Sequence, residues 1–153
     1  MNRPMHFFQY IIVFLFCFQI DRITKGLALE RAVDRYEINQ FLSFELVFNR
    51  GVTGGLFGSD SPLLFLLLSL FIASIIAVLA VYAYFRWRED KSILGEVLTL
   101  AGAISNLLDR VLYQGVIDFV VLSWGDYTFP VFNIADVCIV LGVAIIFFVH
   151  VRE

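Results

Sequence analysis

One segment of the chain is too long and too apolar to belong to an ordinary soluble domain. Residues 63–85 run for 23 positions without a charged side chain, and about 20 apolar residues are enough for a helix to cross a bilayer. The composition agrees, because 60% of the side chains are hydrophobic and 16% are charged, against about 25% charged in soluble domains. High hydrophobicity also excludes a disordered chain. We therefore expect an integral membrane protein.

Shorter apolar segments predict three further spans, at 4–20, 92–108 and 136–151. No small-residue cleavage site follows the first of them, which argues against a cleaved signal peptide. Glu96 lies about one turn inside the third span and is expected to reach water by snorkelling. The predicted fold is a membrane all-α protein, a bundle of four transmembrane helices in one domain over 1–153, with outer loops at 21–62 and 109–135.

The distribution of Lys and Arg residues predicts the orientation of these spans. The two chain ends and the turn 86–91 are very short and hold five basic residues, whereas six are spread over the two long loops. Basic residues concentrate on the cytoplasmic side of short membrane-flanking segments. We therefore expect both termini in the cytoplasm and the long loops on the outer face.

Both long loops contain a segment with the pattern of a β-strand. Residues 42–49 alternate large apolar with smaller or polar side chains, and 116–123 are rich in β-branched residues and lack a helical period. A turn is expected at 124–126, Trp-Gly-Asp. The sequence thus predicts a small β-sheet on the outer face of the bundle.

Several site classes are not expected. The glycine-rich run 51–58 lacks the GK[ST] ending of a phosphate-binding loop, and a net charge of −3 gives no basis for binding nucleic acid. Metal-ligand spacings are missing as well. We expect no cofactor and no metal ion.

Polar residues gather where the third and fourth spans meet the outer face. Taken singly, they have ordinary explanations: Asn133 suits a helix N-cap and Asp136 a first helical turn. Asp118 is harder to explain, because the residues around it in 116–121 are all apolar, so that a lone carboxylate there needs a partner or a role. The set is Asn106, Asp109, Arg110, Asp118, Asn133 and Asp136.

Carboxyl groups brought together in this way favour acid–base chemistry. Two close carboxylates cannot both ionise cheaply, so one keeps its proton and the pair titrates as a unit. Such a pair can activate water against an amide. A second hypothesis is a small ion- or proton-coupled transporter that uses the same aspartates as a relay, which would require acids spread through the membrane depth.

Four ordered blocks resemble the signature blocks of the bacterial lipoprotein signal peptidase (signal peptidase II) family. They are Asn-Leu-Leu-Asp-Arg-Val at 106–111, Gly-Val-Ile-Asp-Phe at 115–119, Phe-Asn-Ile-Ala-Asp at 132–136, and Asp-Arg-Ile-Thr-Lys at 21–25. The resemblance implies an intramembrane aspartic endopeptidase that removes the signal peptide of a prolipoprotein just before its lipid-modified cysteine. It also implies a multi-pass protein of the bacterial cytoplasmic (inner) membrane with its active site at the outer face.

The resemblance also implies roles for individual residues. Asp118 and Asp136 match the catalytic pair. The residues that match substrate-binding positions are Asn49, Gly51, Asn106, Arg110 and Asn133, and those that match supporting positions are Asp21, Lys25 and Asp109. Arg110 has a second reading, as a structural partner of Asp109.

One block departs from the family pattern. Asn49 and Gly51 keep the places they have in N-x-G-A-A-F, but here the aromatic residue Phe57 comes three positions late, which leaves the shape of the 49–58 loop open. The implied partners are a lipidated prolipoprotein and membrane lipids, with the enzyme as a monomer.

Overall fold

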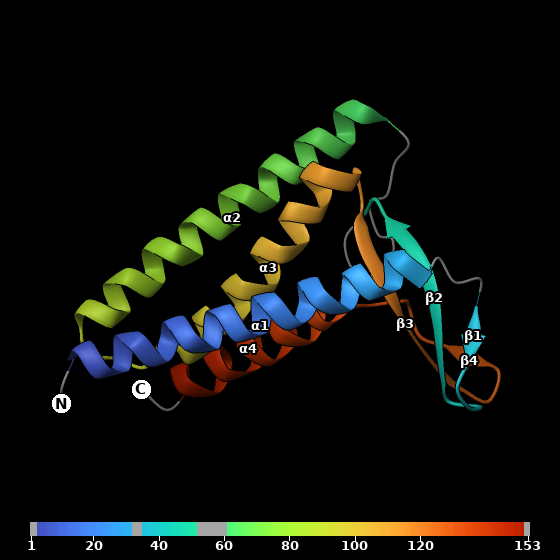
Figure 1. Ribbon diagram of the computed structural model, residues 1–153. Helices are drawn as coiled ribbons and strands as arrows, with labels where there is room; N and C mark the ends of the chain where they lie inside the picture. Colours follow the sequence, from blue (N-terminus) through green and yellow to red (C-terminus); the bar gives the residue numbers. More distant parts are fainter. Residues whose placement is uncertain (1–2, 32–34, 52–60, 152–153) are drawn as a thin grey trace.

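A computed structural model describes residues 3–31, 35–51 and 61–151. Within these ranges, four helices form a bundle, and a four-stranded sheet lies at one end of it (Figure 1). The helices are α1 (Arg3–Arg31), α2 (Pro62–Arg88), α3 (Leu94–Tyr113) and α4 (Ile134–His150). The strands are β1 (Tyr36–Glu37), β2 (Leu42–Asn49), β3 (Val116–Trp124) and β4 (Tyr127–Thr128). The predicted combination of four helices and a small sheet is therefore confirmed.

Helix α3 is the centre of the bundle and contacts each of the other three helices. Glycines allow it to approach α4 closely. A Cβ atom on Gly95 would lie 2.7 Å from the backbone oxygen of Gly142, a separation that a real side chain does not adopt. Helix α1 begins and α4 ends at the same end of the molecule, and the sheet lies at the opposite end (Figure 1).

Helix α2 carries the longest apolar surface. It is the one helix in the described ranges that is long and apolar enough to cross a membrane, and α4 is a shorter apolar helix. The α2 side chains face outward, for example Leu67 at 53% exposure and Val78 at 69%. Because exposed surface of this kind is unfavourable in water, α2 is suited to contact with lipid.

Helix α1 extends beyond the predicted first span. The sequence predicts a span that ends at residue 20 and a loop from 21, but the helix continues to Arg31. The charged residues that follow position 20 do not end the helix because they have partners inside the protein. Asp21 and Lys25 are fully buried and form an i,i+4 ion pair of 2.8 Å.

Glu96 does not snorkel to water as the sequence predicts. Its side chain is 2% exposed, and its Oε1 atom lies 2.9 Å from Nε of Arg86, which is also buried. Arg86 additionally donates to the backbone oxygen of Ser92. This ion pair joins the end of α2 to the start of α3, so burial of each charge is compensated by the other.

The sheet is antiparallel throughout, in the order β1-β2-β3-β4. Both predicted strands are confirmed as β2 and β3, and the predicted turn at 124–126 joins β3 to β4, with Gly125 at a φ of 59°. The register of β2 against β3 shifts between Phe44 and Val47. Bulges of this kind often lie beside functional sites, and here Val47 is the residue opposite Asp118.

Candidate active site

Asp118 lies near the start of β3 and is held by two asparagines from other elements. Its side chain is 2% exposed. Nδ2 of Asn133 donates to Oδ1 at 2.7 Å, and Nδ2 of Asn49 donates to Oδ2 at 3.0 Å. Asn49 reaches it diagonally across the sheet, because Asn49 pairs with Val116, two residues before Asp118. The apolar strand thus presents a carboxyl group whose two oxygens are both held in place.

Asp136 lies in the first turn of α4, where a capping box fixes it. Asn133 is the N-cap residue, and its Oδ1 accepts a 2.9 Å hydrogen bond from the backbone N–H of Asp136. In return, Oδ2 of Asp136 accepts from the backbone N–H of Asn133 at 3.2 Å. The N-cap and first-turn roles predicted for these residues are therefore confirmed, and they coexist with the contact of Asn133 to Asp118.

The two carboxyl groups line one small cavity. Its volume is about 140 Å³, which is enough for several water molecules, since a water occupies about 30 Å³ in the liquid. Its polar lining residues are Asn49, Asn106, Arg110, Asp118 and Asp136, and its apolar lining residues are Ile72, Ala103, Val116 and Ile139. The cavity therefore combines two acids with hydrogen-bond donors and apolar walls.

Burial changes the acidity of Asp118. Loss of hydration, and after it the nearby charge of Asp136, raise the pKa of its carboxyl group from 3.8 to about 7, while the Asn49 and Asn133 hydrogen bonds oppose the shift. A carboxyl group with a pKa near neutrality can hold or release a proton at physiological pH. This is the property that a general acid or base requires.

Two residues of α3 complete the cavity lining. Nδ2 of Asn106 donates to Oδ1 of Asp136 at 2.9 Å. Nη2 of Arg110 donates to the backbone oxygen of Gly51 at 2.8 Å, which holds the end of the segment that follows β2. Nε of Arg110 is buried and has no hydrogen-bond partner among the described residues. The remaining residues of the 49–58 loop, 52–58, lie outside the described ranges.

The reading of Arg110 as a structural partner of Asp109 is not supported. The ion pairs of Asp109 are with Arg22 and with Lys25, both on α1, and the Lys25 contact is 2.7 Å. Asn106, Asp109 and Arg110 share a helical face in the sequence pattern, but Asp109 contacts α1 whereas Arg110 lines the cavity.

An ionic network lies behind the cavity, and its Asp21, Lys25 and Asp109 side chains are fully buried. Asp21 accepts from the backbone N–H of Ala135 at 2.7 Å and from Oγ of Ser105 at 2.6 Å. Asp109 accepts from the backbone N–H of Ile117 at 3.3 Å. The network thus holds the start of α4, which carries Asp136, and the start of β3, which carries Asp118, against α1 and α3.

The structure brings the ten predicted site residues together in three groups. Five line the cavity, three form the ionic network, and Gly51 and Asn133 hydrogen-bond to cavity-lining residues. Asn49 and Gly51 come from the end of β2, and the others from α1, α3, β3 and the start of α4. Sequence reasoning missed Arg22 and Ser105, which join the network through Asp109 and Asp21. Arg22 had a signal, because it lies inside the 21–25 block. No group of three or more metal-binding side chains occurs within 3–31, 35–51 and 61–151.

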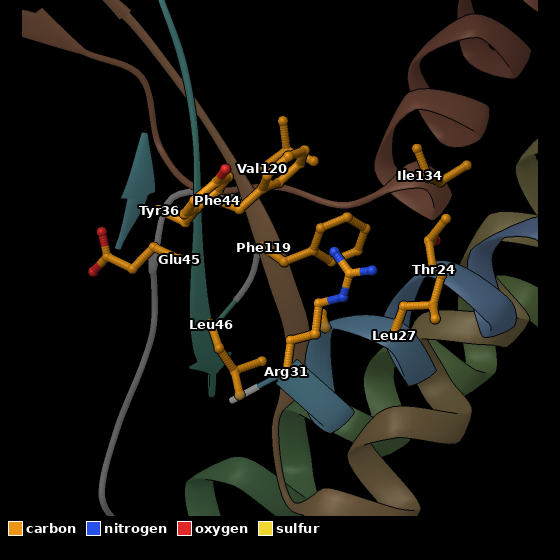
Figure 2. A pocket seen from close by; sticks show the side chains of 11 residues that line it. Thr24, Leu27, Arg31, Tyr36, Phe44, Glu45, Leu46, Phe119, Val120 and Ile134 are labelled. Carbon is orange, nitrogen blue, oxygen red and sulfur yellow. The ribbon is translucent and has the colours of Figure 1, made fainter. Parts of the chain in front are cut away.

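A larger cavity lies beside the sheet but has a different character. It measures about 560 Å³ and is bounded by the end of α1, by β2 and β3, and by the start of α4. Figure 2 shows Phe119 between Arg31 and Leu27 on one side and the β2 strand on the other. Side chains alternate along a strand, so Phe119 points away from the face that carries Asp118. The larger cavity therefore does not contain the two acids.

Comparisons with known proteins agree on one family. The family model described as signal peptidase (SPase) II matches residues 13–152. The lipoprotein signal peptidase of Clostridium novyi is 32% identical over 149 residues, which cover 94% of this chain and 97% of the relative. That of Aquifex aeolicus is 36% identical over 138 residues, covering 90% and 82% respectively.

Solved structures agree with the fold. One structure described as a bacterial membrane enzyme has a TM-score of 0.77 at 25% identity and covers 94% of this chain and 88% of its own. A second with the same description has a TM-score of 0.75 at 26% identity and covers 95% and 94%. The similarity therefore extends over nearly the whole chain.

Proposed function

The chain belongs to the signal peptidase II family, and from this premise we propose that it removes the signal peptide of bacterial prolipoproteins by activating water on the Asp118–Asp136 pair. Family membership makes the chain a peptidase. The observation that carries the aspartic mechanism is the shared cavity: both carboxyl groups line it, and the same residue, Asn133, hydrogen-bonds to both.

The proposed reaction uses one ionised and one protonated carboxyl group. The ionised group takes a proton from water, and the resulting hydroxide attacks the carbonyl carbon of the scissile peptide bond. The protonated group donates its proton to the carbonyl oxygen. Collapse of the tetrahedral intermediate breaks the C–N bond. The first carboxyl group passes the proton that it took from water to the leaving amine of the lipid-modified cysteine, and the second takes back a proton from a hydroxyl group of the intermediate. The pKa of Asp118, raised to about 7, supports this division, because a large share of such groups keeps the proton at neutral pH.

The other polar residues of the cavity are assigned to positioning. Accelerations of about 10⁶ or more require at least about 8 kcal/mol of barrier reduction, and acid–base transfer supplies only about 10²–10⁴ of the rate factor. The remainder must come from oriented donors and a fixed substrate. Asn49 and Asn106 orient the two acids. The Nε–H of Arg110, which has no hydrogen-bond partner among the described residues, is assigned as a donor to a backbone carbonyl of the substrate.

We further propose that the protein crosses the bacterial inner membrane four times as a monomer, with both termini in the cytoplasm and the cavity at the outer face. The outward-facing apolar side chains of α2 support contact with lipid. The position of the sheet, opposite the end where α1 begins and α4 ends, is consistent with a sheet on the outer surface. The charged residues of α1 after position 20 are compatible with a place at the membrane boundary, because Asp21 and Lys25 are buried and pair with each other inside the protein.

Recognition of the lipid is proposed to involve the apolar wall of the cavity. Ile72 of α2 and Ile139 of α4 line it beside the acids. A substrate whose cysteine carries acyl chains would place them against these helices while its peptide bond enters the polar part. Burial of an acyl chain contributes about 0.8 kcal/mol for each CH₂ group, so an unlipidated peptide would bind far more weakly.

The discriminating experiment compares two substrates with purified enzyme in detergent or liposomes. A prolipoprotein peptide with a diacylglyceryl cysteine is expected to be cut just before that cysteine, and the identical unlipidated peptide is expected to remain intact. Equal cleavage of both would overturn the lipid requirement, and cleavage of neither would overturn the proposed activity. A liposome flux assay tests the transporter hypothesis, for which proton or ion flux that depends on Asp118 would be the supporting result.

A further inference from the structure

Lys25 is a buried cation with three acceptors and no access to substrate. Its side chain is 0% exposed. Nζ lies 2.8 Å from Oδ2 of Asp21, 2.7 Å from Oδ2 of Asp109 and 2.7 Å from Oδ1 of Asn106. An ammonium group has three N–H donors, and all three are used. Any influence of Lys25 on the reaction must therefore pass through these partners or through its charge.

The contact with Asn106 has a chemical consequence for the cavity. An amide side chain presents an oxygen acceptor on one side and an NH₂ donor on the other. Lys25 only donates, and Asn133 also donates to the same oxygen, at 3.2 Å. Because Lys25 and Asn133 both donate, the Asn106 amide must turn its oxygen toward them. Its NH₂ group then faces Asp136. In the reversed orientation, the amide would place two N–H groups against an ammonium ion and its oxygen against a carboxylate.

We propose that Lys25 is a positioning residue for the aspartate pair: it holds the Asn106 amide in the orientation that donates to Asp136 and so favours Asp136 as the ionised member. The inference rests on the function proposed above. Both oxygens of each aspartate accept an N–H hydrogen bond, but Asp136 also lies in the first turn of α4, where the helix dipole favours an ionised carboxylate. The proton is then left on Asp118, which serves as the general acid.

The charged side chains that act on the pair come from α1 and α3. Lys25 of α1, whose counter-ions are Asp21 and Asp109, interacts electrostatically with Asp118. Arg110 of α3 interacts with both aspartates of the pair. The charge of Lys25 lowers the pKa of Asp118 against the effect of burial. Lys25 thus acts on the pair in two ways, through the amide of Asn106 and through its electrostatic field.

A matched pair of variants separates positioning from simple stability. Arg22 is a second cation of the same network. It pairs with Asp109 and donates to Oγ of Ser105, and among the described residues it makes no hydrogen bond to Asn106, which accepts from Lys25. Lys25→Met is expected to lower kcat about 10²-fold and to change KM less than about threefold. Misorientation of the Asn106 amide slows the chemical step, whereas substrate binding does not depend on it. It is also expected to move the pH–rate profile to higher pH. Arg22→Met is expected to lower thermal stability while kcat and the profile stay within about threefold of wild type.

Loss of charge balance is a risk for Lys25→Met, so Asp21→Asn/Lys25→Met provides a neutral version of the same change. Asn106→Ala is the third variant. If Lys25 acts through Asn106, then adding Lys25→Met to Asn106→Ala lowers kcat little further, because the two changes remove one interaction. Folding of each variant is checked by its melting transition before kinetics are measured.

The outcomes are distinct for this inference and for the proposed function. Loss of kcat and a shifted profile in the Lys25 variants, with a near-normal Arg22→Met, supports the positioning role. Equal effects of Lys25→Met and Arg22→Met on kcat and on the pH–rate profile would show that Lys25 has only a structural role. If neither Lys25 variant folds, a folded Asn106→Ala with wild-type kcat and pH profile would overturn the inference. An inactive wild-type enzyme contradicts the proposed function itself.

Discussion

Asn133 donates a 2.7 Å hydrogen bond from its side-chain amide to Asp118 while the oxygen of the same amide caps the helix that carries Asp136. One residue therefore couples the strand that holds the first acid to the helix that holds the second. Because the cap uses the oxygen of the Asn133 amide, its NH₂ group is directed to the other side, where it donates to Asp118 and to Asn106. This relationship places the two carboxyl groups in one cavity.

The pH–rate profile is predicted to fall on the alkaline side near pH 7. The folded-state pKa of Asp118 is raised to about 7, so its proton is present below that pH and is lost as the pH rises through it. Asn49 donates to the carboxyl group and opposes the shift. Asn49→Ala is therefore expected to raise the pKa of Asp118 and to move the alkaline limb of kcat to higher pH. An unchanged or acid-shifted limb would contradict the assignment of this proton to Asp118.

Helices α3 and α4 are predicted to pack too closely at Gly102 for any larger side chain. A Cβ atom there would contact the backbone oxygen of Ala135 and lie 3.1 Å from its carbonyl carbon. Because Ala135 precedes Asp136, Gly102→Ala is expected to displace an acid, to cost about 1–3 kcal/mol of stability and to reduce cleavage.

The matched control for that change is Gly26→Ala, in helix α1. A Cβ atom at Gly26 would have no atom within 4 Å, and alanine is the better helix former by about 1 kcal/mol. Thermal unfolding and cleavage rates are measured for both. Equal tolerance of the two substitutions would show that the α3–α4 contact does not set the position of Asp136.

The ion pair of Arg86 and Glu96 is predicted to matter for stability and not for chemistry. It is buried, with a separation of 2.9 Å, and lies at the end of the bundle away from the sheet. Removing one partner of a buried pair costs about 3–5 kcal/mol, so Glu96→Gln is expected to lower the melting temperature while kcat of the folded fraction is unchanged.

An exposed pair nearby serves as the control for Glu96. Glu89 and Lys91 lie 3.1 Å apart with exposures of 61% and 41%, and such pairs contribute about 0–1 kcal/mol. Glu89→Gln is expected to leave the melting temperature nearly unchanged. A loss of stability as large as that of Glu96→Gln would contradict the assignment of the energy to burial.

Much of the candidate site could be predicted because its residues follow local rules. Asn133 and Asp136 have the spacing of a helix cap, and the apolar neighbours of Asp118 indicate a strand with an unexplained acid. Residues 42–49 alternate as a strand does, and that strand delivers Asn49 to the cavity.

The remainder could not be predicted because it depends on contacts between distant segments. The extension of α1 to Arg31 is stabilised by pairing of Lys25 and Arg22 with Asp109, more than 80 positions away. The burial of Glu96 depends in the same way on Arg86 at the end of the preceding helix. Spacing within one helix indicates which residues share a face, but the partner that the face meets is set by the packing of the bundle.

The most direct test of the account is the cleavage rate of a diacylglyceryl-modified prolipoprotein by Asp118→Asn and Asp136→Asn. Asparagine keeps the shape of the side chain and removes its acid–base function. Each variant, folded as judged by its melting transition, is expected to lose at least about 10²-fold in kcat, and the double variant is expected to lose little more because the two groups act as a unit. Asp126→Asn, in the exposed β3–β4 turn, serves as the control and is expected to cleave normally. A folded Asp118→Asn or Asp136→Asn that cleaves at the wild-type rate would contradict the proposed aspartate pair.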